Sequence, residues 1–135
     1  TFGDIYDKIN HLEIQFAQNV NHSNFIPYIQ LHEYEALVFA NLDSLEAEYP
    51  ASNALHKKID ELRAILLKKN NNPELVNTLK APSKYIISAL NGIHNYNKPK
   101  IGASVAQKIK IANLKTKCQH FAQWIDRLEM IRIPI

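Results

Sequence analysis

The chain has 135 residues, of which 46% are hydrophobic, and a formal net charge of +3 at pH 7. This length and composition suit one domain with a buried core, so we treat residues 1–135 as a single domain. No apolar run approaches the roughly 18 residues of a membrane-spanning helix, and no signal-peptide pattern opens the sequence. Cys118 is the only cysteine, which excludes an internal disulfide and favours a reducing, cytoplasmic location.

The first half of the chain predicts helices around one apolar strand. Apolar residues at helical spacing predict an amphipathic helix over about residues 4–19. Phe25 to Leu31 is typical of a strand, and Pro27 favours an early or edge position because it lacks an N–H. Residues 33–39 return to helical spacing, and a short helix is expected over about 43–49, with Asn41 as its cap.

The second half predicts a series of helices. Ser52 is expected to cap a helix that ends at Asn70 to Asn72, and Pro73 to begin a further helical turn. Pro82 is expected to open a helix over residues 83–90 that Gly92 closes. Residues 94–100 suggest a polar loop, followed by helices over about 103–110 and 113–131. The sequence therefore predicts a mainly α fold with one or two short strands, and an isolated strand needs a partner from a sheet elsewhere.

The acidic run after the predicted strand admits two interpretations. His32, Glu33 and Glu35 follow Leu31 at a strand end, where carboxylates can bind a hard divalent cation or orient a water molecule. Alternatively, Glu33 and Glu35 lie in a first helical turn, where the helix dipole favours acids. A zinc peptidase is excluded because there is no second histidine at the required spacing.

Positive charge is concentrated in the second half. Residues 1–56 hold one base against eight acids, whereas residues 57–135 hold fifteen bases against five. Residues 75–125 contain no acid but eight lysines: Lys80, Lys84, Lys98, Lys100, Lys108, Lys110, Lys115 and Lys117. Such a segment attracts polyanions, or it is only a solvated surface.

The Pro82-Ser83-Lys84 sequence at a helix start is a candidate phosphate site. Free backbone N–H groups at a helix N-terminus bind anions, and a hydroxyl and an ammonium beside them suit a phosphate. The alternative is a proline-initiated helix whose Lys84 only points to water. We name Ser83, Lys84, Lys98 and Lys100 as candidate phosphate or nucleic-acid contacts.

Other chemistry is excluded or not favoured. One cysteine with His120 nearby cannot build a closed zinc site, and Cys118 falls on the apolar face of its helix. The three glycines are scattered, so there is no glycine-rich phosphate loop and no P-loop ATP site.

Three segments in order carry a family resemblance. Residues 25–39 read FIPYIQLHEYEALVF, residues 72–77 and 81–84 read NPELVN and APSK, and residues 117–124 read KCQHFAQW. Together they resemble a bacterial family of Toprim-like proteins of unknown function. The chain departs at Gln119, where the family usually has proline, which bears on a helix boundary.

The resemblance implies a fold and partners. The chain would be the C-terminal portion of an α/β Toprim-like fold, acting with an ATPase in defence against phage or other mobile DNA. Toprim-like proteins hold metal with a glutamate and an Asp-x-Asp pair, and Asp4 and Asp7 do not form that pair. We therefore expect the main metal acids upstream of Thr1.

The resulting hypothesis is that the chain forms part of a metal-dependent nuclease that acts on DNA or RNA. Glu33 and His32 are the catalytic candidates, and Glu33 and Glu35 the metal candidates. The metal would be Mg²⁺ or Mn²⁺, in a site that this chain does not complete. The alternative is a non-catalytic helical interaction module that docks the ATPase, so enzymatic activity stays open.

Overall fold

The computed structural model describes residues 3–77 and 80–131, and every regular element in these two ranges is a helix. The α-helices are α1 (Ile5–Val20), α2 (Glu35–Val38), α3 (Leu42–Glu46), α4 (Asn53–Leu67), α5 (Pro82–Leu90), α6 (Ala103–Ile109), α7 (Ile111–Lys117) and α8 (Gln119–Glu129). A 3-10 turn, η1 (Pro73–Leu75), and a π-helix, η2 (Lys98–Gly102), complete the set. The prediction of a mainly α fold is confirmed.

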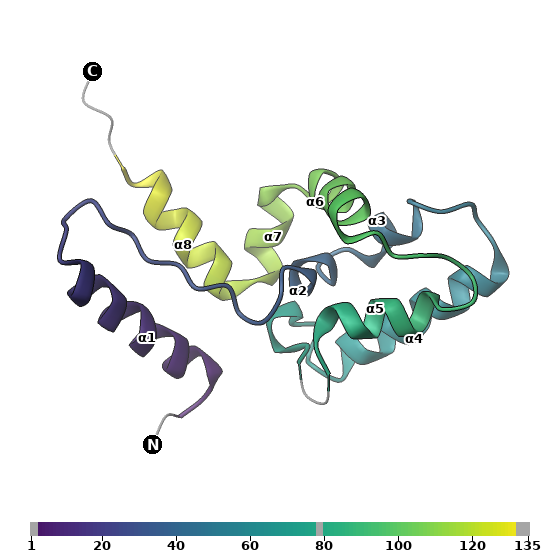
Figure 1. Cartoon of the computed structure of the whole chain (residues 1–135), viewed down its shortest axis with the longest axis horizontal. Helices are drawn as coiled ribbons and strands as arrows, with labels where there is room; N and C mark the ends of the chain where they lie inside the picture. The colour runs from purple at the N-terminus through teal and green to yellow at the C-terminus, as the bar shows by residue number, and fades with distance from the viewer. Residues whose placement is uncertain (1–2, 78–79, 132–135) are drawn as a thin grey trace.

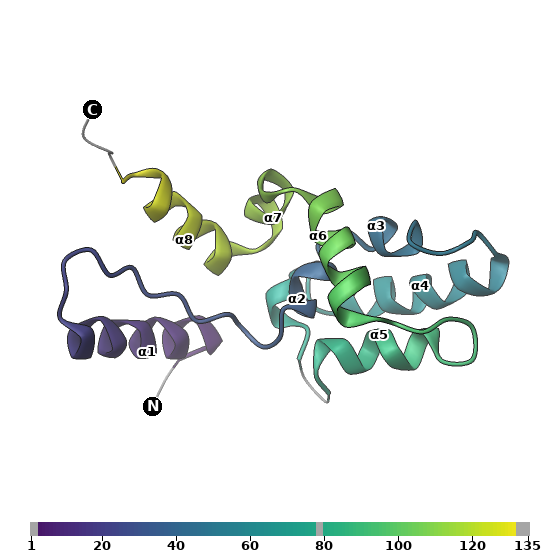
Figure 2. The same ribbon diagram turned by 45° about the horizontal axis from the view of Figure 1, so that its top comes forward.

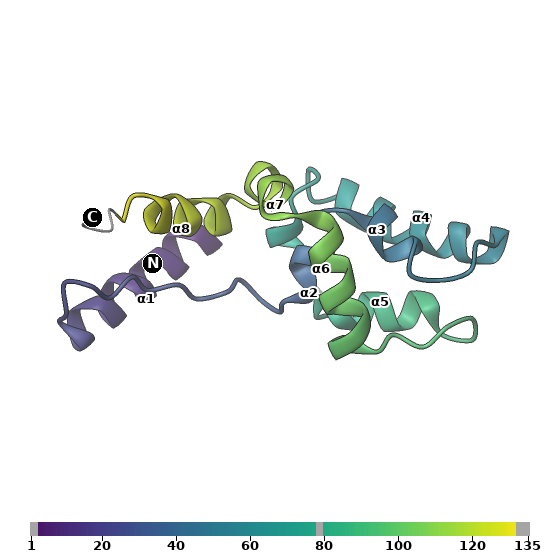
Figure 3. The same cartoon turned by 90° about the horizontal axis from the view of Figure 1, so that it is seen from above.

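The helices gather at two ends of an elongated molecule (Figure 1). Helices α4 and α5 pack together at one end, with α3 and α6 beside them. Helices α1 and α8 lie at the other end, and α2 and α7 lie between the two groups, as the rotated views also show (Figures 2 and 3). No helix in the described ranges is long and apolar enough to cross a bilayer.

The helix starts follow the local sequence. Asp4 begins α1 with a capping box, in which its carboxylate accepts from Asp7 N and the Asp7 carboxylate accepts from Asp4 N. The side chains of Asn41 and Ser52 accept from backbone N–H groups at the starts of α3 and α4, and Pro82 occupies the first position of α5. These predicted starts are confirmed, and α1 lies one residue from its predicted bounds.

The core lies in the group formed by α3, α4, α5 and α6, and it is contributed mainly by α2, α4, α5 and α6. Its fully buried large side chains include Val38, Phe39, Leu45, Leu55, Ile59, Leu62, Ile86, Leu90 and Ile109. Cys118 is also completely buried in this core, as its apolar position predicts. Burying a side chain such as Leu or Phe contributes about 1.5–3 kcal/mol relative to exposing it, so this cluster is what holds the helices together.

The predicted strand is the clearest difference. Residues 25–30 form no helix and no strand pairing, and none of the residues in the described ranges forms a strand. A strand is defined by hydrogen bonds to a neighbouring strand, and none of the residues 3–77 and 80–131 pairs with this segment in that way. The prediction of one or two short strands is therefore wrong for these residues.

Two other predicted boundaries differ. The helix predicted over residues 113–131 is two helices, α7 and α8, because Cys118 adopts an extended conformation (φ −120°, ψ 93°) between them. The loop predicted over 94–100 ends in η2, where Asn97 caps the π-helix by accepting from Lys100 N at 3.1 Å. The second difference depends on a local cap, because Asn97 and Lys100 are three positions apart.

Candidate functional site

The side chain of Glu33 contacts the N-terminus of α5, although Ser83 in that helix lies fifty residues after Glu33 in the sequence. Its Oε2 accepts a hydrogen bond from Ser83 N at 2.8 Å. Hydrogen bonding with Ser83 lowers the pKa of Glu33, and the charges of Lys98 and Lys84 act in the same direction. The carboxylate is thus held ionised where two separately predicted candidate segments meet.

This contact changes the interpretation of the Pro-Ser-Lys segment. Pro82 has no N–H, Ser83 N donates to Glu33, and Lys84 N donates to Ala81 O at 2.9 Å. The backbone donors that an incoming phosphate would use are therefore engaged within the chain. Of this segment, the exposed side chain of Lys84 is the group left to contact a phosphate.

Glu35 is a buried carboxylate that contacts the side chains of Lys98 and Tyr96. The side chain is 0% exposed, and Lys98 Nζ lies 3.0 Å from its Oε2 as an ion pair without hydrogen-bond geometry. Tyr96 OH donates to Glu35 Oε1 at 3.3 Å. The ion pair raises the pKa of Lys98, so the ammonium stays charged at neutral pH.

The π-helix η2 carries Lys98 and begins two residues after Tyr96. Tyr34, which precedes α2, donates from its hydroxyl to Gly102 O at 2.9 Å and so joins α2 to the end of η2. A Cβ at Gly102 would lie 3.3 Å from both the Tyr34 ring and Tyr96 OH, closer than most such contacts. π-helices are rare and are often found at functional sites.

His32 does not join the two glutamates. It has a left-handed backbone (φ 64°), and its Nδ1 lies 2.7 Å from Asn77 Nδ2. Partial burial lowers its pKa, so the imidazole is neutral at pH 7. Within 3–77 and 80–131 it hydrogen-bonds to neither Glu33 nor Glu35.

The lysines of the acid-free segment are partly paired with acids from outside it. Lys108 Nζ lies 2.5 Å from Glu48 Oε1, and Lys115 Nζ lies 2.6 Å from Asp126 Oδ1 and 2.9 Å from Glu129 Oε2. Together with the Lys98 pair, three of the eight lysines are neutralised. Lys84 and Lys100 make no side-chain ion pair with any described residue, so they are the candidates that keep a free charge.

The described residues do not fit a complete divalent-metal site. No group of three or more His, Cys, Asp or Glu side chains in the described ranges could hold a metal ion. One oxygen of Glu33 is engaged by Ser83, and Glu35 is closed off by Lys98. We derive no metal-dependent step from these residues.

A second polar cluster, which no sequence motif had indicated, surrounds Glu74. This carboxylate is 1% exposed, accepts from His120 N and Phe121 N at 3.0 Å each, and accepts from Tyr6 OH at 2.9 Å. It thereby satisfies the first free N–H groups of α8 from outside the helix. The spacing of the sequence gives no signal for a cap supplied from 46 residues away.

Glu13 makes a related connection. It is 6% exposed, and its Oε1 lies 2.8 Å from His120 Nε2 and accepts from Ile29 N at 2.7 Å. His120 is itself buried and stacks on Tyr28, with ring centroids 5.3 Å apart. Glu13 and Glu74 thus join α1, segment 25–31 and η1 to the start of α8.

These features define a class: a helical domain whose sequence motifs meet in two polar clusters, one around Glu33 and Glu35 and one around Glu74 and His120. The chain belongs to the family described as "Domain of unknown function (DUF4276)", whose model matches residues 1–129. No curated protein and no solved structure matches it.

Proposed function

We propose that this chain is the nucleic-acid-contacting, helical part of a Toprim-like metal-dependent nuclease that works with an ATPase partner. The observation that supports the proposal is the meeting of Glu33, Ser83–Lys84 and Lys98 from three separate segments. The metal would be Mg²⁺ or Mn²⁺ and would be held chiefly by other residues. Glu33 retains some exposure, and its Oε1 accepts no hydrogen bond from the described residues.

The proposed contacts to phosphate are Lys84 and Lys100. Both side chains are exposed, and neither forms an ion pair within 4 Å with an acid of the described residues. Lys98 does not contact phosphate in this proposal. Its ammonium pairs with the buried Glu35, so the charge of that carboxylate does not repel a polyanion. Backbone phosphates dominate nucleic-acid affinity, so two exposed lysines without an ion pair suit such a surface.

The experiment measures salt-dependent binding of the chain to labelled single-stranded DNA, single-stranded RNA and duplex DNA by fluorescence anisotropy. In the double variant with Lys84→Gln and Lys100→Gln, the binding constant should depend less steeply on salt. We expect the negative slope of log K against log salt to shrink in magnitude by about 0.7–0.9 for each lysine that no longer neutralises a phosphate. The matched control is Lys57→Gln, an exposed lysine on α4. Equal slopes for the double variant and the wild type contradict the proposal, and so does an absence of binding at low salt.

The second candidate function is an interaction module that docks the ATPase. It is favoured by one face of α1, where Leu12, Phe16 and Val20 are 40%, 46% and 43% exposed although they belong to the apolar stripe of the helix. Apolar stripes normally face a core or a partner. Calorimetric titration with the ATPase tests this: Leu12→Glu should weaken binding about tenfold or more. Ile87→Glu, at an exposed apolar position of α5, is the control that should not.

A further inference from the structure

Segment 25–31 runs between the α1–α8 end of the molecule and α2 without forming regular structure (Figure 1). It is nevertheless half-buried along most of its length, and Pro27 and Leu31 are buried. Loops that are partly buried have to satisfy their backbone donors and acceptors within the protein, with water or with a partner. We therefore compare which backbone N–H groups of the segment are hydrogen-bonded and which are not.

The edge of the segment that faces α1 is closed. In an extended chain, alternate residues present their N–H and C=O groups to the same edge. Pro27 and Ile29 are alternate residues of this segment: Pro27 has no N–H, and Ile29 N donates to Glu13 Oε1 at 2.7 Å. Neither residue therefore has a free donor.

The opposite edge is open. Ile26, Tyr28 and Gln30 alternate with the two residues above, and their backbone N–H groups make no hydrogen bond to any residue of 3–77 or 80–131. A row of free donors and acceptors at alternate residues is the arrangement that pairs with a β-strand.

Side-chain contacts hold this edge in place. The Tyr28 ring stacks on Trp124 of α8, with centroids 4.5 Å apart, and its hydroxyl donates to Gln30 Oε1 at 2.5 Å. Gln30 Nε2 in turn donates to Leu31 O at 3.1 Å. A segment fixed in this way loses little further conformational entropy when a strand pairs with it.

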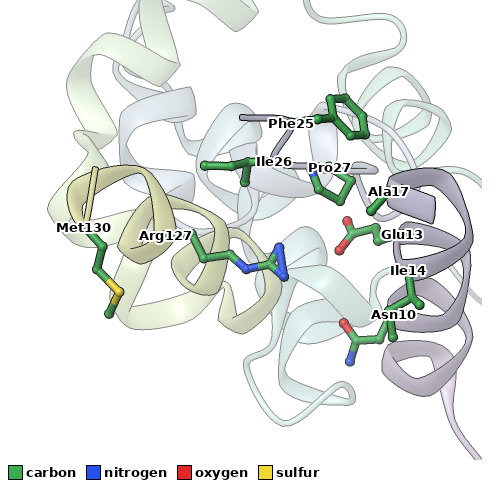
Figure 4. Close-up of a pocket in the computed structure, with 9 residues that line it drawn as sticks. All are labelled: Asn10, Glu13, Ile14, Ala17, Phe25, Ile26, Pro27, Arg127 and Met130. Carbon is green, nitrogen blue, oxygen red and sulfur yellow. The ribbon is translucent and has the colours of Figure 1, made fainter. Parts of the chain in front are cut away.

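A pocket adjoins the segment and could receive a side chain of the added strand. It has a volume of about 560 Å³ and lies between α1, residues 25–27 and α8 (Figure 4). Its lining is mainly apolar and includes Ile14, Ala17, Phe25, Ile26, Pro27 and Met130. Figure 4 shows the Arg127 guanidinium reaching into the space between α8 and α1. Arg127 forms no ion pair with any residue that the structure describes.

We propose that the Ile26–Tyr28–Gln30 edge is a docking site for a β-strand of a partner protein. The strand would carry alternating apolar residues, one of which enters the pocket, and an acidic residue that pairs with Arg127. Backbone pairing would provide affinity, and the pocket and the cation would provide selectivity. The proposal is independent of nucleic-acid binding, which involves different residues.

Amide hydrogen exchange followed by NMR tests the proposal on the chain with a defined probe. The probe is an acetylated hexapeptide in which valine and threonine alternate after an initial glutamate, and the control probe is the same peptide with every amide N-methylated. We expect the amides of Ile26, Tyr28 and Gln30 to exchange freely in the chain alone and about tenfold or more slowly with the first probe. Ile29 should be protected in both states.

Three results would overturn the proposal. The first is that the three amides are as protected as Ile29 before any probe is added. The second is that they gain no protection at saturating probe, and the third is that the N-methylated probe protects them equally. A pair of variants gives a second readout that does not depend on exchange. Both Gln30→Pro and Gln30→Ala lose the side-chain contacts of Gln30, but only Gln30→Pro also removes the backbone donor of the open edge. Gln30→Pro should therefore bind the probe about tenfold more weakly than Gln30→Ala.

Discussion

Glu74 Oε2 accepts a hydrogen bond from His120 N at 3.0 Å, although the two residues are 46 positions apart. Glu74 Oε1 accepts in the same way from Phe121 N. The carboxylate of the Asn-Pro-Glu segment is thus the N-terminal cap of α8, and it defines where that helix begins. Two of the sequence motifs that carry the family resemblance are therefore halves of one structural contact.

Replacing Glu74 with alanine should destabilise the fold by about 2–4 kcal/mol, because it leaves two buried N–H groups and the Tyr6 hydroxyl without their acceptor. Glu74→Gln keeps one acceptor oxygen and should cost less. Urea unfolding followed by circular dichroism gives both values. Glu61→Ala, at an exposed glutamate of α4, is the control and should lie within about 0.5 kcal/mol of the wild type. A Glu74→Ala variant as stable as this control would show that the cap is dispensable.

Removing Lys98 should expose the cost of burying Glu35. Lys98→Met leaves a 0% exposed carboxylate with only the Tyr96 hydroxyl, and we expect a loss of about 1–3 kcal/mol, since Lys98 itself is largely exposed. The double variant with Glu35→Gln should recover part of this loss, because no unpaired charge remains. The measurement is a double-mutant cycle of unfolding free energies. Strictly additive effects would contradict a direct interaction between the two side chains.

Acid should weaken the contact between α6 and Glu48. Hydrogen bonds from Lys108 and Ser104 lower the pKa of Glu48 below its ordinary value of 4.5. Its unfolded form therefore binds protons first as the pH falls, so the stability that Glu48 contributes is complete above about pH 4.5 and is lost as the pH falls through the folded-state pKa. The wild type should exceed Glu48→Gln in stability at neutral pH, and the difference should shrink in acid. A difference that is constant with pH would contradict this origin.

Cys118 should be unreactive in the folded protein. The thiol is 0% exposed, and burial raises its pKa to about 12, so almost no thiolate is present at mildly alkaline pH. Labelling with an aromatic disulfide reagent should therefore occur only at the rate of local or global opening, and promptly after denaturation in urea. Complete labelling of the native chain within seconds would show that Cys118 is accessible.

Much of the local structure could be predicted from short-range sequence signals. The capping residues Asp4, Asn41 and Ser52, and Pro82 at the start of α5, act through neighbours three or fewer positions away, so their effect can be read from the sequence. The apolar position of Cys118 likewise predicted its burial. The strand prediction at residues 25–31 failed in the described structure because β pairing requires a partner, which a local pattern cannot supply.

The candidate site was predictable only in part. The sequence identified Glu33, Glu35, Ser83, Lys84 and Lys98 one segment at a time, from residue type and from position at helix starts. That Ser83 donates to Glu33 and Lys98 pairs with Glu35 follows from how α2, α5 and η2 pack. The buried roles of Glu13 and Glu74 had no local signal at all, since their partners lie up to 107 positions away.

By itself, the sequence determined the helical character of the chain, most helix starts and the uneven distribution of charge, because each depends on residue type and near neighbours. Only the tertiary structure decided which acids are engaged and which lysines remain free. A carboxylate's role depends on the donor that meets it, and in this protein those donors arrive from distant segments when the helices pack on a common core.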